Sequence, residues 1–115
     1  MNSIKQEKAK KFALRIVKLC KQLKEQREYV LSDQILRSGT SIGANLMEAE
    51  HAQSRSDFLH KNSISLKEAN ETIYWLDLLF EGEYISQEIY SSFKSDCNEL
   101  IKILISVVKS IKANL

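Results

Sequence analysis

Apolar residues recur every three or four positions along most of the chain, which is the spacing of helices with one buried face. The first apolar stripe, within about residues 3–27, consists of Ala9, Phe12, Ile16, Leu19 and Leu23. The second stripe consists of Ile35, Ser38, Ile42, Leu46 and Ala49. We expect the helix that carries it to begin near Ser32 or Asp33, since either side chain can cap a helix N-terminus.

Two further helices are predicted after a break at about residues 52–56. Ser54 or Ser56 is the expected cap of the third helix, and Gly82 is its expected stop. The expected core stripe of this helix consists of Phe58, Leu66, Ala69, Ile73, Leu76 and Phe80. Ser86 is the expected cap of the fourth helix, whose apolar positions are Ile89, Phe93, Cys97, Leu100, Ile101, Ile103, Leu104, Val107, Val108 and Ile111. Four amphipathic helices with short connections predict an all-α fold, an antiparallel up-down-up-down four-helix bundle forming a single domain over residues 1–115.

Small and polar residues interrupt the apolar pattern of the two middle helices. Gly39 and Gly43 lie four positions apart, and each glycine costs up to about 1 kcal/mol in a helix interior, so we expect a neighbouring helix to approach closely there. A polar set faces the region between the second and third helices and consists of Arg37, Ser38, Ser41, Asn45, Glu68 and Glu71. Buried charges must be paired, so the set predicts a structural network between helices or subunits, with a binding pocket as the alternative.

The third and fourth helices carry apolar residues over a wider arc than one bundle can cover. On the fourth helix this arc spans about 200°, against the roughly 100° that a core-facing stripe requires. Uncovered apolar surface of this size usually marks an interface, and Trp and Tyr are favoured there. The predicted homo-oligomer interface consists of Ile64, Tyr74, Trp75, Leu78, Ile101 and Ile105. The alternative for Trp75 and Tyr74 is that they cover one end of the bundle.

Charge is distributed unevenly along a chain whose net charge is only +2. Residues 1–28 hold nine basic and three acidic residues, whereas the remainder is net acidic. Basic residues lie on the side of the first helix opposite its apolar stripe, and this pattern predicts an anion-binding face for nucleic-acid phosphates. The face consists of Lys10, Lys11, Arg15, Lys18 and Lys21. An ordinary solvated helix face is the alternative.

Other chemistry has little support in the sequence. Glu48 and His51 match the Glu-x-x-His motif of di-iron bundles, and Asp57 with His60 is a weaker second match, but both lie near the helix break. We therefore expect no metal or other cofactor, and no enzyme. Two cysteines in apolar stripes, no apolar run long enough to span a membrane and no secretory signal predict a cytoplasmic protein.

Three segments of the chain closely resemble a known family, the bacterial four-helix-bundle proteins encoded in intervening sequences of 23S rRNA genes. They are FALRIVKLCKQL (Phe12–Leu23), RSGTSIGANLMEAEHAQSRSDF (Arg37–Phe58) and KEANETIYWLDLL (Lys67–Leu79). The specific core of the match consists of Arg37, Ser38, Ser41, Ile42 and Asn45, while the fourth helix matches only in pattern. The resemblance implies a homopentameric ring and brings no catalytic residues. The accessory proteins of diversity-generating retroelements are similar, and there a positively charged pentamer works with a reverse transcriptase and its RNA.

The sequence and the resemblance together predict a non-enzymatic homo-oligomer that contacts RNA or DNA through its basic first helix. The alternative is a scaffold with no nucleic-acid role, whose protein partner docks on Leu14 and Val17 beside the basic face. A metal-binding bundle is a distant third possibility.

Overall fold

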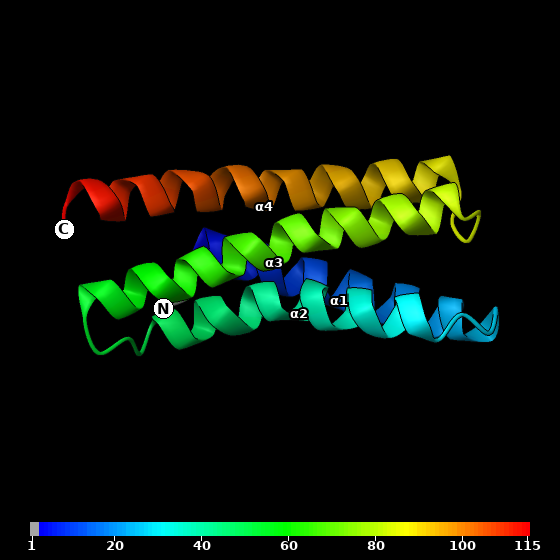
Figure 1. Cartoon of the computed structure of the whole chain (residues 1–115), viewed down its shortest axis with the longest axis horizontal. Coiled ribbons are helices and arrows are strands. Elements are labelled where there is room, and N and C mark those ends of the chain that lie inside the picture. Colours follow the sequence, from blue (N-terminus) through cyan, green and yellow to red (C-terminus); the bar gives the residue numbers. More distant parts are fainter. Residues whose placement is uncertain (1–2) are drawn as a thin grey trace.

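Residues 3–115 form four α-helices and no strand in the computed structural model, which describes this part of the chain (Figure 1). The helices are α1 (Ile4–Glu25), α2 (Val30–Ala49), α3 (Arg55–Glu81) and α4 (Gln87–Ala113). Consecutive helices run antiparallel and pack side by side in a rod of 46 × 22 × 20 Å. The predicted all-α fold and four-helix bundle are confirmed.

The four helices are not packed equally. α2 packs along both α1 and α3, and α3 packs along α4, whereas α1 and α4 meet over a much smaller area. In Figure 1, α3 crosses at an angle between α2 and α4. The seam between α1 and α4 is therefore the loosest side of the bundle.

Serine caps begin three of the helices. The hydroxyls of Ser3, Ser54 and Ser86 each accept a backbone N–H from the first turn of α1, α3 and α4, respectively. Such caps satisfy backbone donors that have no partner within the helix. The predicted cap of α4, Ser86, is confirmed. Of the two candidates for the cap of α3, the structure selects Ser54 and not Ser56. At the other end of α3, Gly82 is the C-cap as predicted, and a Cβ there would lie 2.8 Å from the Leu78 carbonyl oxygen.

The predicted start of α2 is wrong, because the helix begins at Val30 and neither Ser32 nor Asp33 is its cap. The carboxylate of Glu28 takes the capping role instead and accepts the Leu31 N–H at 2.6 Å. Ser32 is fully buried, and its hydroxyl lies 3.4 Å from a carbonyl oxygen of α1. A serine that looked like a cap is thus a polar core residue.

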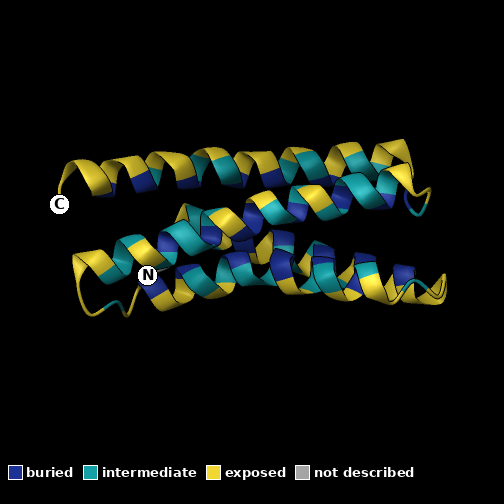
Figure 2. Ribbon diagram, viewed as in Figure 1, coloured by how far each residue is buried: buried dark blue, intermediate teal, exposed yellow. Residues whose placement is uncertain are grey.

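The core follows the predicted stripes in α1 and α2 but not in α3. Figure 2 shows buried residues on the inward sides of the helices and exposed residues outside. All five stripe residues of α1 and all five of α2 are buried. Of the stripe predicted for α3, only Ala69 and Leu76 are buried, and the others are half-buried. The buried face of α3 instead consists of Asn62, Ser65, Glu68, Ala69, Thr72, Leu76 and Leu79.

Hydrogen bonds to other helices explain why α3 buries polar residues. The Ser65 hydroxyl donates to the Ile42 carbonyl of α2 at 2.8 Å, and the Thr72 hydroxyl lies 2.8 Å from that of Ser38. Asn62 accepts a hydrogen bond from Lys5 of α1 at 3.1 Å. A buried polar group with a partner avoids the desolvation cost that would otherwise exclude it from the core.

The two glycines of α2 face α1, as the predicted close approach requires. A Cβ on Gly39 would lie 2.9 Å from Ile16 Cγ1, closer than real side chains pack. A Cβ on Gly43 would lie at an ordinary 3.5 Å from the Ala9 Cβ. Gly39 is therefore the position where the contact between α1 and α2 depends on the absence of a side chain.

Candidate nucleic-acid interface

The five basic residues predicted to bind nucleic acid lie on α1, but they are not equivalent. Lys10, Lys11, Lys18 and Lys21 are exposed. Arg15 is half-buried against α4: its Nη1 lies 2.6 Å from Asp96 Oδ2, its Nη2 donates to the Ser92 hydroxyl at 2.9 Å, and its guanidinium lies 4.1 Å from the centre of the Phe93 ring. The guanidinium therefore holds α1 against α4.

A second ion pair closes the same seam. Lys8 Nζ lies 3.1 Å from Glu99 Oε1, one helical turn further along α4 than Asp96. Acids of α4 thus neutralise the side of α1 that faces them. This explains how a loosely packed seam holds together, and it removes Arg15 from the set of free cations.

The remaining four lysines project from α1 into solvent. None of them makes an ion pair within residues 3–115. From Lys10 to Lys21 the helix rises about 16 Å, enough to reach several phosphates along one strand. Lys11 and Lys18 line shallow hollows on the side of α1 towards α4, whereas Lys10 lines a hollow on the side towards α2. The lysines therefore lie on two sides of α1 and do not gather around one cavity, an arrangement suited to backbone contacts and not to enclosing a small ligand.

The predicted polar set forms a network between α2 and α3 through some of its members. Arg37 forms ion pairs with Glu68, at 2.8 Å, and with Glu71. Glu71 also accepts the Trp75 indole N–H at 2.9 Å. Ser38 joins the network through its contact with Thr72.

Ser41 and Asn45 do not join this network. The Ser41 hydroxyl donates to the Arg37 carbonyl, and the Asn45 amide donates to the Ser41 carbonyl, both within α2. No buried side-chain nitrogen or oxygen among residues 3–115 lacks a hydrogen-bond partner. The network is therefore internally complete and presents no unpaired buried group to a ligand.

The six residues of the predicted oligomer interface differ in exposure. Tyr74 is 56% exposed and Ile105 is 39% exposed. The other four are half-buried: Ile64, Trp75, Leu78 and Ile101. Other exposed apolar residues on α1 and α2 lie outside the predicted interface: Val30 at 73%, Ile4 at 69%, Met47 at 67% and Leu14 at 54%.

Met47 and its neighbours border a groove between α1 and α2. The groove encloses about 390 Å³ and is lined by Gln6, Lys10, Ala13, Thr40, Gly43, Ala44, Met47 and Glu50. Apolar periodicity did not predict it, because its floor consists of small residues that contribute little to such a pattern. The two glycines of α2 were the only signal, and they indicated only the contact with α1.

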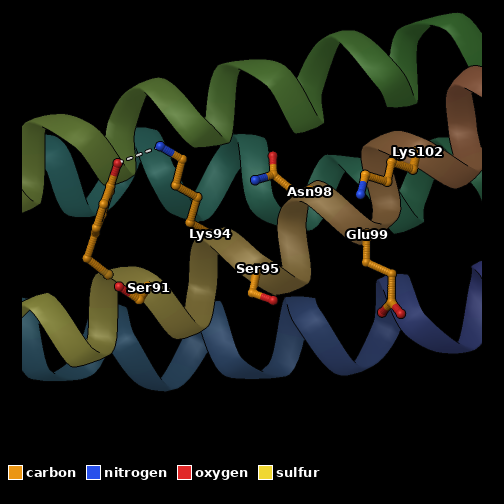
Figure 3. A pocket seen from close by; sticks show the side chains of 7 residues that line it. Ser91, Lys94, Ser95, Asn98, Glu99 and Lys102 are labelled. Carbon is orange, nitrogen blue, oxygen red and sulfur yellow. Dashed lines mark hydrogen bonds between the residues drawn. The ribbon is translucent and has the colours of Figure 1, made fainter.

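A larger hollow, of about 650 Å³, is outlined by seven side chains of α4 alone (Figure 3). Its charged groups are largely engaged: the Lys94 amine donates to the Tyr90 hydroxyl at 2.8 Å, and Glu99 pairs with Lys8. Tyr90 in turn donates to Asp77 at 2.5 Å. This open face of one helix has the features of a solvated surface.

The residues weighed as metal ligands are not assembled. Within residues 3–115, no group of three or more His, Cys, Asp or Glu side chains is placed to hold a metal ion. Glu48 pairs with Lys61 at 2.7 Å, and Asp57 accepts the Gln53 N–H at 3.2 Å.

Both cysteines are buried. Burial raises the pKa of Cys20, and it raises the pKa of Cys97 to about 12. The Cys97 thiol lies 3.3 Å from the Ala69 carbonyl oxygen. A buried thiol with a raised pKa is a poor nucleophile and a poor metal ligand.

None of the described helices is both long enough and apolar enough to cross a bilayer.

Comparisons with known proteins agree with this architecture. A search of curated proteins finds no match. A solved structure, of a protein with unknown function from the S23 ribosomal protein family of Bacteroides thetaiotaomicron VPI-5482, is similar with a TM-score of 0.90 and 58% sequence identity. The match covers 92% of this chain and 99% of that one. Residues 2–106 also match the family described as 23S rRNA-intervening sequence protein. The chain therefore belongs to the family of 23S rRNA-intervening sequence proteins.

Proposed function

We propose that this protein is a non-enzymatic homo-oligomer that contacts structured RNA through the exposed lysines of α1. The observation that carries the proposal is a helix with four solvent-facing lysines, none in an ion pair within residues 3–115, on a chain whose remaining residues are net acidic. Five copies, the number that the family resemblance implies, would place twenty such lysines on one particle. Repetition of a modest basic face gives a strong summed field even though each chain carries only +2.

Binding of this kind is driven by release of counterions from phosphates. Its affinity should therefore fall steeply with salt and depend little on sequence. The proposal requires neither a pocket nor a catalytic group.

Paired lysine substitutions test the proposal in gel shifts with a structured RNA over a salt series. The variant Lys11→Ala/Lys18→Ala removes two phosphate contacts per chain. The slope of log affinity against log salt concentration should therefore become shallower by about 1.4–1.8 for each copy that touches the RNA. Lys109→Ala/Lys112→Ala on α4 is the charge-matched control and should bind like the wild type. No shift at low salt, or equal losses in both variants, would contradict the proposal.

The exposed Leu14 favours a second candidate function, a scaffold for another protein. Leu14 lies beside the lysines of α1, and Val17 on the next turn is half-buried. A partner recovered from nuclease-treated native lysate by the wild type, and lost with Leu14→Glu, would support the scaffold over RNA contact.

A further inference from the structure

The guanidinium of Arg15 is held from several directions at the seam between α1 and α4. Its two terminal nitrogens engage Asp96 at 2.6 Å and Ser92 at 2.9 Å, and it lies 4.1 Å over the centre of the Phe93 ring. Phe93 packs in turn against the edge of Phe12, with ring centres 6.3 Å apart. The Arg15 side chain nevertheless remains 37% exposed. A planar cation is thus fixed in place, with part of its surface open to solvent, before any ligand arrives.

A hollow of about 320 Å³ between α1 and α4 begins at this guanidinium. Its lining consists of Arg15, Lys18, Leu19, Gln22, Ile89 and Phe93. Leu19 and Phe93 are buried and Ile89 is half-buried, so the floor is apolar, whereas Lys18 and Gln22 are exposed. An apolar floor beside a planar cation and a side-chain amide suits a flat heterocycle, which has apolar faces and a polar edge.

A second hollow, of about 190 Å³, lies along the same seam. The ion pair connects the two, because Arg15 lines the first hollow and Asp96 lines the second. Lys11 borders the second hollow and Lys18 the first, about 10 Å apart along α1. The second hollow also contains Glu99, whereas the lining of the first holds no acidic residue. Charge therefore favours the first hollow for a segment of nucleic acid.

We propose that the hollow beside Arg15 binds one unpaired base of an RNA, with Lys18 and Lys11 contacting phosphates on either side of that base. The inference rests on the proposed function and names the nucleotide that the basic helix recognises. Unpaired RNA bases stack on aromatic rings and on arginine guanidinium planes. Asp96 already neutralises Arg15, which suits it to contact a base and leaves the phosphates to the lysines.

The base must be unpaired, because a base within a duplex is already stacked on its neighbours and is costly to extrude. Structured RNA supplies such bases in bulges and loops. Stacking tolerates any base, since every base has a flat face. The site therefore selects the local structure of the RNA and leaves the expected independence of sequence intact.

Two hairpin RNAs test the site on the unmodified protein. One hairpin carries a single bulged purine in its stem, and the other carries an abasic residue at the bulge, which keeps every phosphate but lacks the base. Wild-type affinity should be at least about fivefold higher for the purine hairpin, the low end of what stacking of one base contributes. The salt slopes should be equal, because the phosphate contacts are unchanged. Equal affinities would overturn the site and leave the proposed function standing, whereas no binding of either hairpin at low salt would overturn both.

Arg15→Lys identifies the residue responsible, because lysine keeps the charge and lacks the planar face. The ratio of the two affinities should fall to about one, and the salt slope should stay that of the wild type. Arg55→Lys, at an exposed arginine where α3 begins, is the matched control and should keep the wild-type ratio. Circular dichroism checks that both variants retain their helices. A wild-type ratio in a folded Arg15→Lys protein would overturn the role of Arg15.

Photocross-linking locates the base without any substitution, and so decides the matter if Arg15→Lys loses helicity. The hairpin then carries 5-iodouracil at the bulge, is irradiated with the wild-type protein, and the cross-linked peptides are identified by mass spectrometry. Cross-links should fall within residues 15–22 of α1 or 89–93 of α4. Cross-links confined to other segments would overturn the site.

Discussion

Removal of the Arg37 guanidinium should destabilise the bundle by about 2 kcal/mol. The Arg37→Ala change breaks the ion pairs with Glu68 and Glu71, whose side chains are 12% and 28% exposed. The pair with Glu68 contributes about 1.5 kcal/mol, the low end for hydrogen bonds to charged groups, since the Arg37 side chain is itself 49% exposed. The more exposed Glu71 pair adds about 0.5 kcal/mol.

Urea denaturation followed by circular dichroism measures this loss, at one fixed protein concentration because oligomers couple stability to concentration. For a chain of this length, about 2 kcal/mol corresponds to a fall in Tm of about 8 °C. Lys24→Ala is the matched control, since Lys24 and Asp33 are 4.0 Å apart and both well exposed, and its cost should stay below about 0.5 kcal/mol. A double-mutant cycle of Arg37→Ala with Glu68→Gln isolates the pair. A coupling near zero, or equal losses for Arg37 and Lys24, would refute the assignment of a stabilising network.

Two further predictions concern stability. Gly39→Ala should destabilise the protein by about 1–2 kcal/mol, because the new methyl would press on Ile16. Gly43→Ala has room beside Ala9 and should be neutral or stabilising by up to about 1 kcal/mol. Equal effects of the two changes in urea titrations would contradict the close packing at Gly39. Burial raises the pKa of Cys97 from 9.0 to about 12, so the folded state retains the thiol proton more strongly than the unfolded state does. The free energy of unfolding should therefore fall as pH rises from about 9 to 12, by up to about 1.4 kcal/mol per pH unit. Urea midpoints that decline equally in Cys97→Ala would exclude this thiol as the cause.

The fold could be predicted from the sequence because most of its information is local. The stripes of α1 and α2 contain few polar residues, and their helical spacing identifies the buried face directly. Cap residues such as Ser54 and Ser86 act within three positions of themselves. These features need no knowledge of which helices are neighbours.

Features that depend on a distant partner could not be predicted. The buried face of α3 includes Asn62, Ser65 and Thr72, which any analysis of apolar spacing treats as polar positions. They enter the core only because other helices supply hydrogen bonds. Arg15 looked like the neighbouring lysines, but its acidic partner lies 81 positions away. The other four residues of the predicted set, all lysines, are exposed, and their contact with nucleic acid stays a prediction.

The α1–α2 groove was missed for a related reason. Ala13 and Ala44 belong to no hydrophobic stripe, and they form a hollow only when two helices pack together. Met47, which also lines it, is an ordinary isolated apolar residue in the sequence. The groove is a property of the packed helices and not of either segment.

The mass of the wild-type particle in solution tests the central claim most directly, because the summed positive field of the proposed homo-oligomer requires several copies. Native mass spectrometry or sedimentation equilibrium at micromolar concentration should give a discrete particle at five times the chain mass of 13.2 kDa. A particle of 13.2 kDa that persists across the concentration range would contradict the account.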